Sequence, residues 1–422
     1  MKIAFVSMPL TGHLNPMTAL ARKLQSRGHE VVFICLPDAE QIVRAAKLEF
    51  IPMCEEEFPV GTVAKEYAPM ATLHGEDVVR YSATQLHPRR CQAVLEQLPG
   101  KLTASGVEAV VIDTVHFFVE LAPMRLGLPY VHVWNVLNVD ASGSSPVCFF
   151  SWPYEATPEA IVRNIEGLKR IGSYLAPVVD VAKAYAKKHG LQIDWSRPAA
   201  TISKLAVVSQ SPKEFDFPNI PWPPQFHYAG PFHDGEGREP IAFPWEKLTG
   251  EPLIYASMGT LVNGMEYVHR TILAAAKKIP GTQLVLSVGK NIDPKELEPI
   301  PPNAIVVRSA PQINLLKQAS LCITHAGMNT ALESLAQGVP MVAIPIGFDQ
   351  PGVAARIAYH RAGEFVEIAD LTVERLAALI QQVHTNPAYR DKARYFQKVI
   401  ADTRGLDLAA NVIHHAFVTG NA

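Results

Sequence analysis

The sequence has no excess of charge of either sign and no long apolar run. Its 38 Lys and Arg residues nearly balance 40 Asp and Glu residues, for a formal net charge of −2. Such a balance gives no electrostatic footprint for a nucleic acid. No apolar run approaches the roughly 18 residues of a transmembrane helix. The apolar start of the chain ends at Pro9 without a small-residue cleavage site, so we interpret it as a strand and not a signal peptide.

Patterns for metal ligation and dinucleotide binding are also missing. The 15 histidines are scattered, and neither Cys-x-x-Cys, His-Glu-x-x-His nor Asp-x-Asp occurs, so we expect no metal site. The five cysteines are odd in number and widely spread, which favours reduced thiols in a cytoplasmic protein. The only Gly-x-Gly, Gly235 to Gly237, does not follow a strand, which argues against an NAD-dependent dehydrogenase.

What is present is a repeated alternation of buried strands and amphipathic helices. This alternation is typical of an α/β protein with doubly wound parallel sheets. In the first half we expect strands at 2–8, 30–36 and 107–113, a loop at 11–15, an irregular stretch at 55–75, and helices from Pro16, over 76–98 with a break at Pro88, and from Thr114.

A Pro- and Gly-rich stretch divides the chain, and such a composition is typical of a linker. The alternation restarts after it. We therefore predict a Rossmann-like domain over 1–220, a linker over 221–249, a second Rossmann-like domain over 250–400, and a C-terminal helix over 401–422 that packs back on the first domain.

Residues 320–350 have the pattern of a strand, a glycine-containing turn, a helix and a second strand. In open α/β sheets, ligands bind outside the carboxyl ends of the strands, and a helix that begins there offers its free N–H groups to an anion. We predict a diphosphate site formed by His325, Gly327, Asn329 and Thr330. Glu333, one turn later, is placed to accept hydrogen bonds from a ribose diol. The alternative is that Thr330 and Glu333 form only a capping box.

The longer stretch over residues 309–350, SAPQINLLKQASLCITHAGMNTALESLAQGVPMVAIPIGFDQ, resembles the signature box of the nucleotide-sugar-dependent glycosyltransferases. These are the enzymes of the plant secondary-metabolite and bacterial macrolide or zeaxanthin type. The box opens here with Pro311, and Asp349 with Gln350 stands where the family binds the sugar hydroxyls. The resemblance implies donor binding by Ala310, Gln312, His325, Gly327, Met328, Asn329, Thr330, Glu333, Asp349 and Gln350.

The chain departs from the plant members of this family at two positions. Ser309 stands where those members have a Trp that stacks on uracil, which leaves thymine nucleotides as an alternative to UDP. Met328 replaces a second Trp, and we expect no effect there if only the backbone contributes. The loop Ser257-Met258-Gly259-Thr260 resembles the family's Ser-Phe-Gly-Ser loop, which implies that the Thr260 hydroxyl reaches the phosphates.

The loop with Gly12-His13 and Pro16 matches the position at which the family places its catalytic base. An imidazole can take the proton of a hydroxyl that attacks the anomeric carbon of a sugar. Asp113 ends a buried strand on the same face of a parallel sheet, where it can orient His13. The alternatives are a solvated loop histidine and an aspartate that caps a helix.

The resemblance implies the GT-B fold, in which two Rossmann-like domains face each other, and a metal-independent, inverting transfer of a hexose. We expect UDP-glucose as donor and co-substrate, without a cofactor, and an apolar hydroxylated acceptor such as a flavonoid or other phenolic, a carotenoid or a macrolide. The protein is then a monomer or weak dimer with no nucleic-acid partner. A sugar-nucleotide epimerase and a non-catalytic nucleotide-sugar-binding protein are the alternatives. Aromatic residues that are candidates for the core or the acceptor pocket are Phe117, Phe118, Trp134, Phe149, Phe150, Trp152 and Tyr154.

Overall fold

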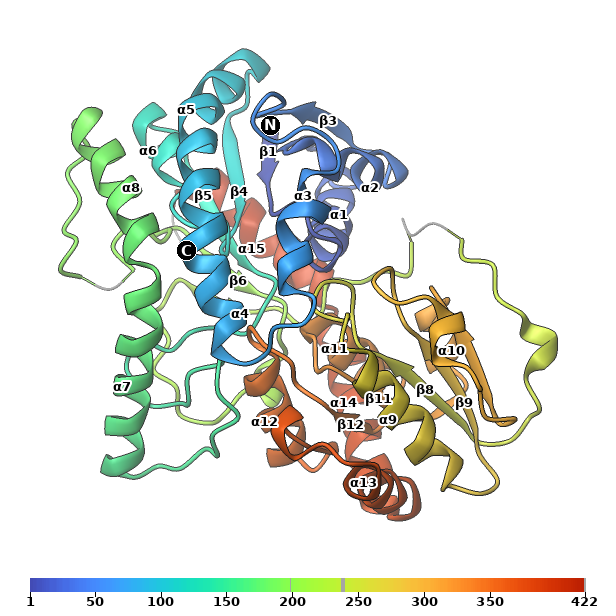
Figure 1. Ribbon diagram of the computed structural model, residues 1–422. Coiled ribbons are helices and arrows are strands. Elements are labelled where there is room, and N and C mark those ends of the chain that lie inside the picture. The colour runs from blue at the N-terminus through green and yellow to red at the C-terminus, as the bar shows by residue number, and fades with distance from the viewer. Residues whose placement is uncertain (198, 237–239, 421–422) are drawn as a thin grey trace.

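The computed structural model describes residues 1–197, 199–236 and 240–420. Residues 237–239 of the expected linker, with Gly237, and the last two residues of the expected C-terminal helix lie outside the described residues. Two α/β domains face each other, each built on a parallel sheet with helices on both faces (Figure 1). This confirms the doubly wound fold predicted from the alternation of strands and helices.

The first sheet has seven parallel strands in the order β3-β2-β1-β4-β5-β6-β7. The strand order reverses beside β1, so the carboxyl ends of β1 and β4 flank a topological switch point, where open sheets bind ligands. The strands are β1 (Lys2–Val6), β2 (Glu30–Cys35), β3 (Glu49–Pro52), β4 (Ala109–Asp113), β5 (Tyr130–Trp134), β6 (Val207–Ser209) and β7 (Phe226–Tyr228).

The second sheet has six parallel strands in the order β10-β9-β8-β11-β12-β13. Its switch point lies between β8 and β11, whose last residues, Ser257 and Thr324, are partners in the register. The strands are β8 (Leu253–Ser257), β9 (Gln283–Ser287), β10 (Ala304–Val307), β11 (Ala319–Thr324), β12 (Met341–Ala343) and β13 (Gly363–Phe365).

The α-helices connect and cover the strands. Those of the first domain are α1 (Thr11–Gln25), α2 (Glu40–Ala45), α3 (Thr62–Tyr67), α4 (Glu76–Tyr81), α5 (His87–Ser105), α6 (Leu121–Leu126), α7 (Pro158–Tyr174) and α8 (Ala176–Lys188). Those that follow are α9 (Glu266–Lys277), α10 (Gln312–Leu316), α11 (Met328–Ala336), α12 (Gln350–Tyr359), α13 (Val373–Thr385), α14 (Pro387–Thr403) and α15 (Gly405–Thr419).

The prediction of a loop over residues 11–15 is wrong, because α1 already begins at Thr11. The carbonyl of Leu10 accepts hydrogen bonds from the N–H groups of His13 and Leu14 and so closes the first turn. Pro16 therefore lies inside the helix and not at its start. His13 belongs to the first turn of a helix that leaves the carboxyl end of β1.

The prediction of an irregular stretch over residues 55–75 is also wrong, because it contains α3. The Asp38 carboxylate, from a distant part of the sequence, accepts the N–H groups of Gly61 and Val63 at the start of that helix. Such a tertiary cap leaves no local signal. The break expected at Pro88 is a π-helical turn, Ser82–Leu86, between α4 and α5, and the helix expected from Thr114 begins only at Leu121.

The chain passes from the first domain to the second between β7 and β8, and it returns to the first domain between α14 and α15. Strand β7 pairs with β6 in the first sheet although it lies inside the range 221–249 predicted as linker. At the other end, Arg404 separates α14 from α15 with a positive φ of 50°. Helix α15 packs on α1, and its Ala410 and Ile413 share an apolar core with Leu14. The last helix thus belongs to the core of the first domain.

Candidate active site

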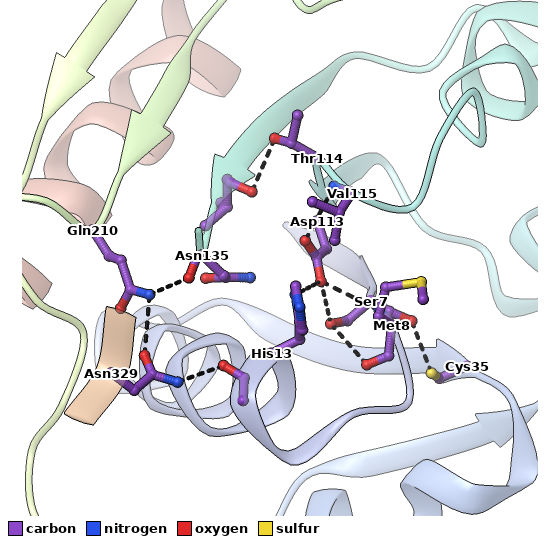
Figure 2. A network of polar contacts seen from close by, with 12 residues as sticks. Ser7, Met8, His13, Cys35, Asp113, Thr114, Val115, Asn135, Gln210 and Asn329 are labelled. Atoms are coloured by element: carbon purple, nitrogen blue, oxygen red, sulfur yellow. Dashed lines mark hydrogen bonds and ion pairs between the residues drawn. The ribbon is translucent and has the colours of Figure 1, made fainter. Parts of the chain in front are cut away.

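His13 and Asp113 meet at the switch point of the first sheet. The Nδ1 atom of His13 lies 2.8 Å from Oδ2 of Asp113, which also accepts from the hydroxyl of Ser7 at 3.0 Å and the N–H of Met8 at 3.3 Å (Figure 2). A carboxylate only accepts hydrogen bonds, so the Nδ1 atom of His13 carries a proton. Its Nε2 atom then presents a lone pair, which is the arrangement that a general base requires.

Charge and burial shift the pKa values of both His13 and Asp113. Burial alone would lower the pKa of His13, but the charge of Asp113 and the hydrogen bond to it outweigh burial and raise that pKa above 6.5. Burial alone would raise the pKa of Asp113, but His13 and the two hydrogen bonds from Ser7 and Met8 hold it below 3.8. Two neighbouring histidines, His87 and His116, differ, because burial and the charge of Arg90 lower their pKa to about 3.

The residues predicted to bind a diphosphate lie at the start of α11. Its N-cap is Gly327, and His325 lies between the end of β11 and that glycine. The imidazole of His325 fits closely against two glycines, because a Cβ atom would lie 2.6 Å from Nε2 if added at Gly259 and 2.4 Å if added at Gly327. Burial lowers the pKa of His325 to about 4. A neutral ring can donate one hydrogen bond to an anion but adds no charge.

Three residues of the predicted ribose and phosphate site lie together on α10 and α11. The Nε2 atom of Gln312 donates to Oε2 of Glu333 at 2.6 Å and to the hydroxyl of Thr330 at 3.3 Å. The hydroxyl of Tyr255 donates to Oε1 of Gln312 at 3.1 Å. Glu333 is 4% exposed, so this network holds a buried carboxylate in place on α11.

The remaining donor-site candidates differ in exposure. Thr260 and Ser309 are exposed at the carboxyl ends of β8 and β10. The side chains of Ala310 and Met328 instead belong to the apolar core of the second domain. These two residues therefore offer only backbone atoms to a ligand.

Asp349 and Gln350 lie at the start of α12, and both already hold backbone groups. The Oδ2 atom of Asp349 accepts the N–H of Leu137, from the first domain, at 2.9 Å. The Oε1 atom of Gln350 accepts the N–H groups of Ile346 and Gly347. Burial raises the pKa of Asp349, against the bond from Leu137 that lowers it. Asp349 of the predicted sugar-binding pair thus also joins the two domains.

The structure adds two residues that the sequence did not single out. Gln210 follows β6, and its Nε2 atom donates to the carbonyl of Asn135 at 2.5 Å and to Oδ1 of Asn329 at 3.1 Å. Asn135 follows β5. Its side-chain amide is buried and has no hydrogen-bond partner among the described residues. Figure 2 places it between Gln210 and His13. Both residues come directly after a buried strand, which is the signal that identified Asp113.

Among residues 1–197, 199–236 and 240–420, no group of three or more His, Cys, Asp or Glu side chains is arranged to hold a metal ion. In the same residues, no helix is both long and apolar enough to span a membrane.

Comparison with known proteins gives consistent matches. A family model described as UDP-glucoronosyl and UDP-glucosyl transferase matches residues 206–418. Zeaxanthin glucosyltransferase of Pantoea ananas is 27% identical over 99% of this chain and 96% of its own length. Demethyllactenocin mycarosyltransferase of Streptomyces fradiae is 27% identical over 97% of this chain and 85% of its own. The crystal structure of the glycotransferase of kitacinnamycin shares the fold, with a TM-score of 0.77 at 24% identity over 99% of both chains.

Proposed function

This chain belongs to the UDP-glucoronosyl and UDP-glucosyl transferase family and has the GT-B fold, and from that premise we propose the reaction it catalyses. We infer that it moves a hexose, glucose first among the candidates, from a UDP-sugar to a hydroxyl group of an apolar small molecule. The transfer inverts the configuration at the anomeric carbon.

The observation that carries this proposal is the His13–Asp113 pair on the domain that faces the start of α11. In the proposed step, the Nε2 atom of His13 takes the proton of the acceptor hydroxyl while the hydroxyl oxygen attacks the anomeric carbon. Asp113, 2.8 Å from the other ring nitrogen, stabilises the imidazolium that forms. The bond from the anomeric carbon to the diphosphate breaks in the same step, and the nucleoside diphosphate leaves with the bonding electron pair.

The start of α11 supports the departure of this anion. Free N–H groups and the positive end of the helix dipole stabilise negative charge as it develops. The neutral imidazole of His325 and the hydroxyl of Thr330 lie at the same helix end, where each can donate a hydrogen bond. We propose that these groups, with Thr260, hold the diphosphate and that the reaction needs no metal ion or cofactor.

The nucleotide proposal depends on Glu333. A buried carboxylate held by Gln312 is suited to accept both hydroxyls of a ribose, which favours UDP over a deoxyribose nucleotide. Where the resemblance places the nucleobase, the exposed Ser309 offers no aromatic ring to stack on uracil. A dTDP-sugar therefore remains an alternative donor to be tested beside the UDP-sugar.

The acceptor proposal rests on the matched relatives and on the surroundings of His13. The names of those relatives specify zeaxanthin and demethyllactenocin. Beside the site, Phe117 packs edge-on against the neutral His87, with ring centroids 4.8 Å apart. Phe118 packs on Trp195 and Phe150 stacks on Trp152. His87, the partner of Phe117, is instead close enough to His13 for the charge of His13 to contribute to lowering the His87 pKa. We therefore propose Phe117 as the aromatic wall of an apolar acceptor site.

The test is a panel in which UDP- and dTDP-sugars are each combined with carotenoid, macrolide and flavonoid alcohols and read by mass spectrometry. We expect a glycosylated product with UDP-glucose and at least one acceptor class. Donor incubated alone separates the alternatives. An epimerised sugar in that sample would instead show an epimerase, and UDP binding without a product from any acceptor would show a non-catalytic nucleotide-sugar-binding protein.

A further inference from the structure

We propose that Gln210 is a positioning residue that fixes the side chain of Asn329 and thereby sets the start of α11 against the helix that carries His13. The inference rests on the proposed function, because it assigns Gln210 a role in glycosyl transfer. Gln210 lies in the first domain, some two hundred residues from His13 in the sequence, and is 2% exposed.

The backbone of α1 contains a carbonyl group that has no helical hydrogen-bond donor. In an α-helix the carbonyl of Gly12 would accept the N–H of residue 16, but that residue is proline and has no N–H. Gly12 therefore keeps a free carbonyl lone pair in the turn that contains His13. The Nδ2 atom of Asn329 donates to this oxygen at 2.6 Å from the other domain.

The side-chain amide of Asn329 is held by partners on two sides. Its Oδ1 atom accepts from Nε2 of Gln210 at 3.1 Å (Figure 2). The same Nε2 atom donates to the carbonyl of Asn135, so Gln210 must present its amino group on this side. A donor at Gln210 selects the oxygen of Asn329 and turns its amino group toward Gly12. The two contacts thus specify a single orientation of the Asn329 side chain.

The Asn329 side chain connects the start of α11 with the first turn of α1. Asn329 is the second residue of α11 and lies two positions after Gly327, against which His325 packs, and Gly12 is the residue before His13. The chain of contacts from Gln210 through Asn329 to Gly12 therefore ties the predicted diphosphate site to the turn that contains the base. Displacement of reacting groups by about 1 Å costs up to about 100-fold in rate. An amide held on both sides limits such displacement.

The principal variants are Gln210→Ala and Gln210→Glu, because a carboxylate at this position cannot donate to Asn135 or Asn329. We expect kcat for transfer to fall about 10- to 100-fold in both. The affinity for UDP, measured by calorimetry, stays within about threefold of wild type, because the Asn329 side chain is engaged with Gly12 and Gln210 and its backbone N–H at the start of α11 remains for the diphosphate in both variants. The matched control is Gln192→Ala, an exposed glutamine on the first domain, which should leave both values unchanged.

A double-mutant cycle with Asn329→Ala tests whether Gln210 acts through Asn329. Residues that act as one unit are not additive, so Gln210→Ala should slow the Asn329→Ala enzyme by less than about twofold. Pro16→Ala tests the contact between Asn329 and Gly12 from the side of α1. Alanine restores a backbone N–H at residue 16, which can donate to the Gly12 carbonyl in competition with Asn329. We expect a lower kcat in Pro16→Ala without loss of thermal stability.

A readout independent of acceptor chemistry completes the test. Hydrogen exchange in residues 8–18 should slow when UDP binds to the wild-type protein and should slow less in Gln210→Ala. Full transfer activity in Gln210→Ala, additive effects in the cycle, or an equal exchange response in both proteins would overturn the inference while leaving the proposed function in place. Absence of UDP binding by the wild type would overturn both.

Discussion

Asp113 holds His13 through a 2.8 Å contact between side chains that are 100 residues apart in the sequence. One comes from the end of β4 and the other from the first turn of α1, and the parallel order of β1 and β4 brings them together. The Asp113 carboxylate is itself fixed by Ser7 and Met8. This arrangement makes the protonation state of His13 depend on Asp113, and that dependence can be measured.

The pH dependence of transfer should change in Asp113→Asn. The base must be neutral, so wild-type kcat/KM should rise with pH through a pKa above 6.5, the direction to which Asp113 shifts His13. Without the carboxylate charge, burial dominates and the rising limb should move to lower pH. The maximal rate should fall about 10²- to 10⁴-fold because the imidazolium loses its partner. A rise of kcat/KM at the same pH in Asp113→Asn as in the wild type would contradict this account. The control is Asp391→Asn, because Asp391 is exposed.

Gly327→Ala should weaken UDP binding by displacing His325. The φ of Gly327 is −61°, which any residue adopts, so its backbone tolerates alanine, but the new Cβ would lie 2.4 Å from Nε2 of His325. We expect the Kd for UDP to rise about tenfold or more, the cost of roughly one lost charge-assisted hydrogen bond. In the control, Gly172→Ala on α7, the Cβ meets nothing within 4 Å. That variant should bind UDP normally. Equal Kd values in the two variants would show that the close packing of His325 against Gly327 does not contribute to UDP binding.

Glu333→Gln should separate ribose from deoxyribose nucleotides. The substitution keeps the shape of the side chain but replaces one acceptor oxygen with a donor group, so one of the two ribose hydroxyls loses its partner. We expect the Kd for UDP to rise about five- to tenfold and that for dTDP, which lacks the 2′-hydroxyl, to change less. Calorimetric titration with both nucleotides measures this difference. Equal losses for both would show that Glu333 is only structural.

The ion pair of Asp216 and Arg356 should contribute to the stability of the whole chain. Both side chains are 2% exposed, and the Arg356 Nη2 atom lies 2.7 Å from Oδ1 of Asp216. Asp216→Asn leaves a buried guanidinium without its counter-charge, so the free energy of unfolding should fall by about 3–5 kcal/mol. The exposed pair of Arg270 and Glu266 is the control, for which Glu266→Gln should cost under about 0.5 kcal/mol. Urea denaturation curves of the two variants with equal midpoints would contradict the prediction.

The spacing of apolar residues along the sequence was sufficient to locate most strands and helices, and with them the site residues that lie at the carboxyl ends of strands. His325 and Asp113 could be placed because parallel strands bring their carboxyl ends to one edge of a sheet. The position of His13 on a helix could not, since Pro16 is typical of a helix start and here lies inside α1. Contacts between the domains, such as Asn329 with Gly12 or Asp349 with Leu137, depend on how the two domains pack against each other. No periodicity along the chain encodes that relationship.

The central claim is that His13 is the base and that the nucleotide is held by the other domain. Its most direct test is the rate of transfer from UDP-glucose by His13→Ala, measured beside calorimetric binding of UDP and the exposed control His415→Ala. We expect His13→Ala to lose about 10²- to 10⁴-fold in kcat while its Kd for UDP stays within about threefold of wild type. Turnover by His13→Ala within about threefold of wild type would contradict the account.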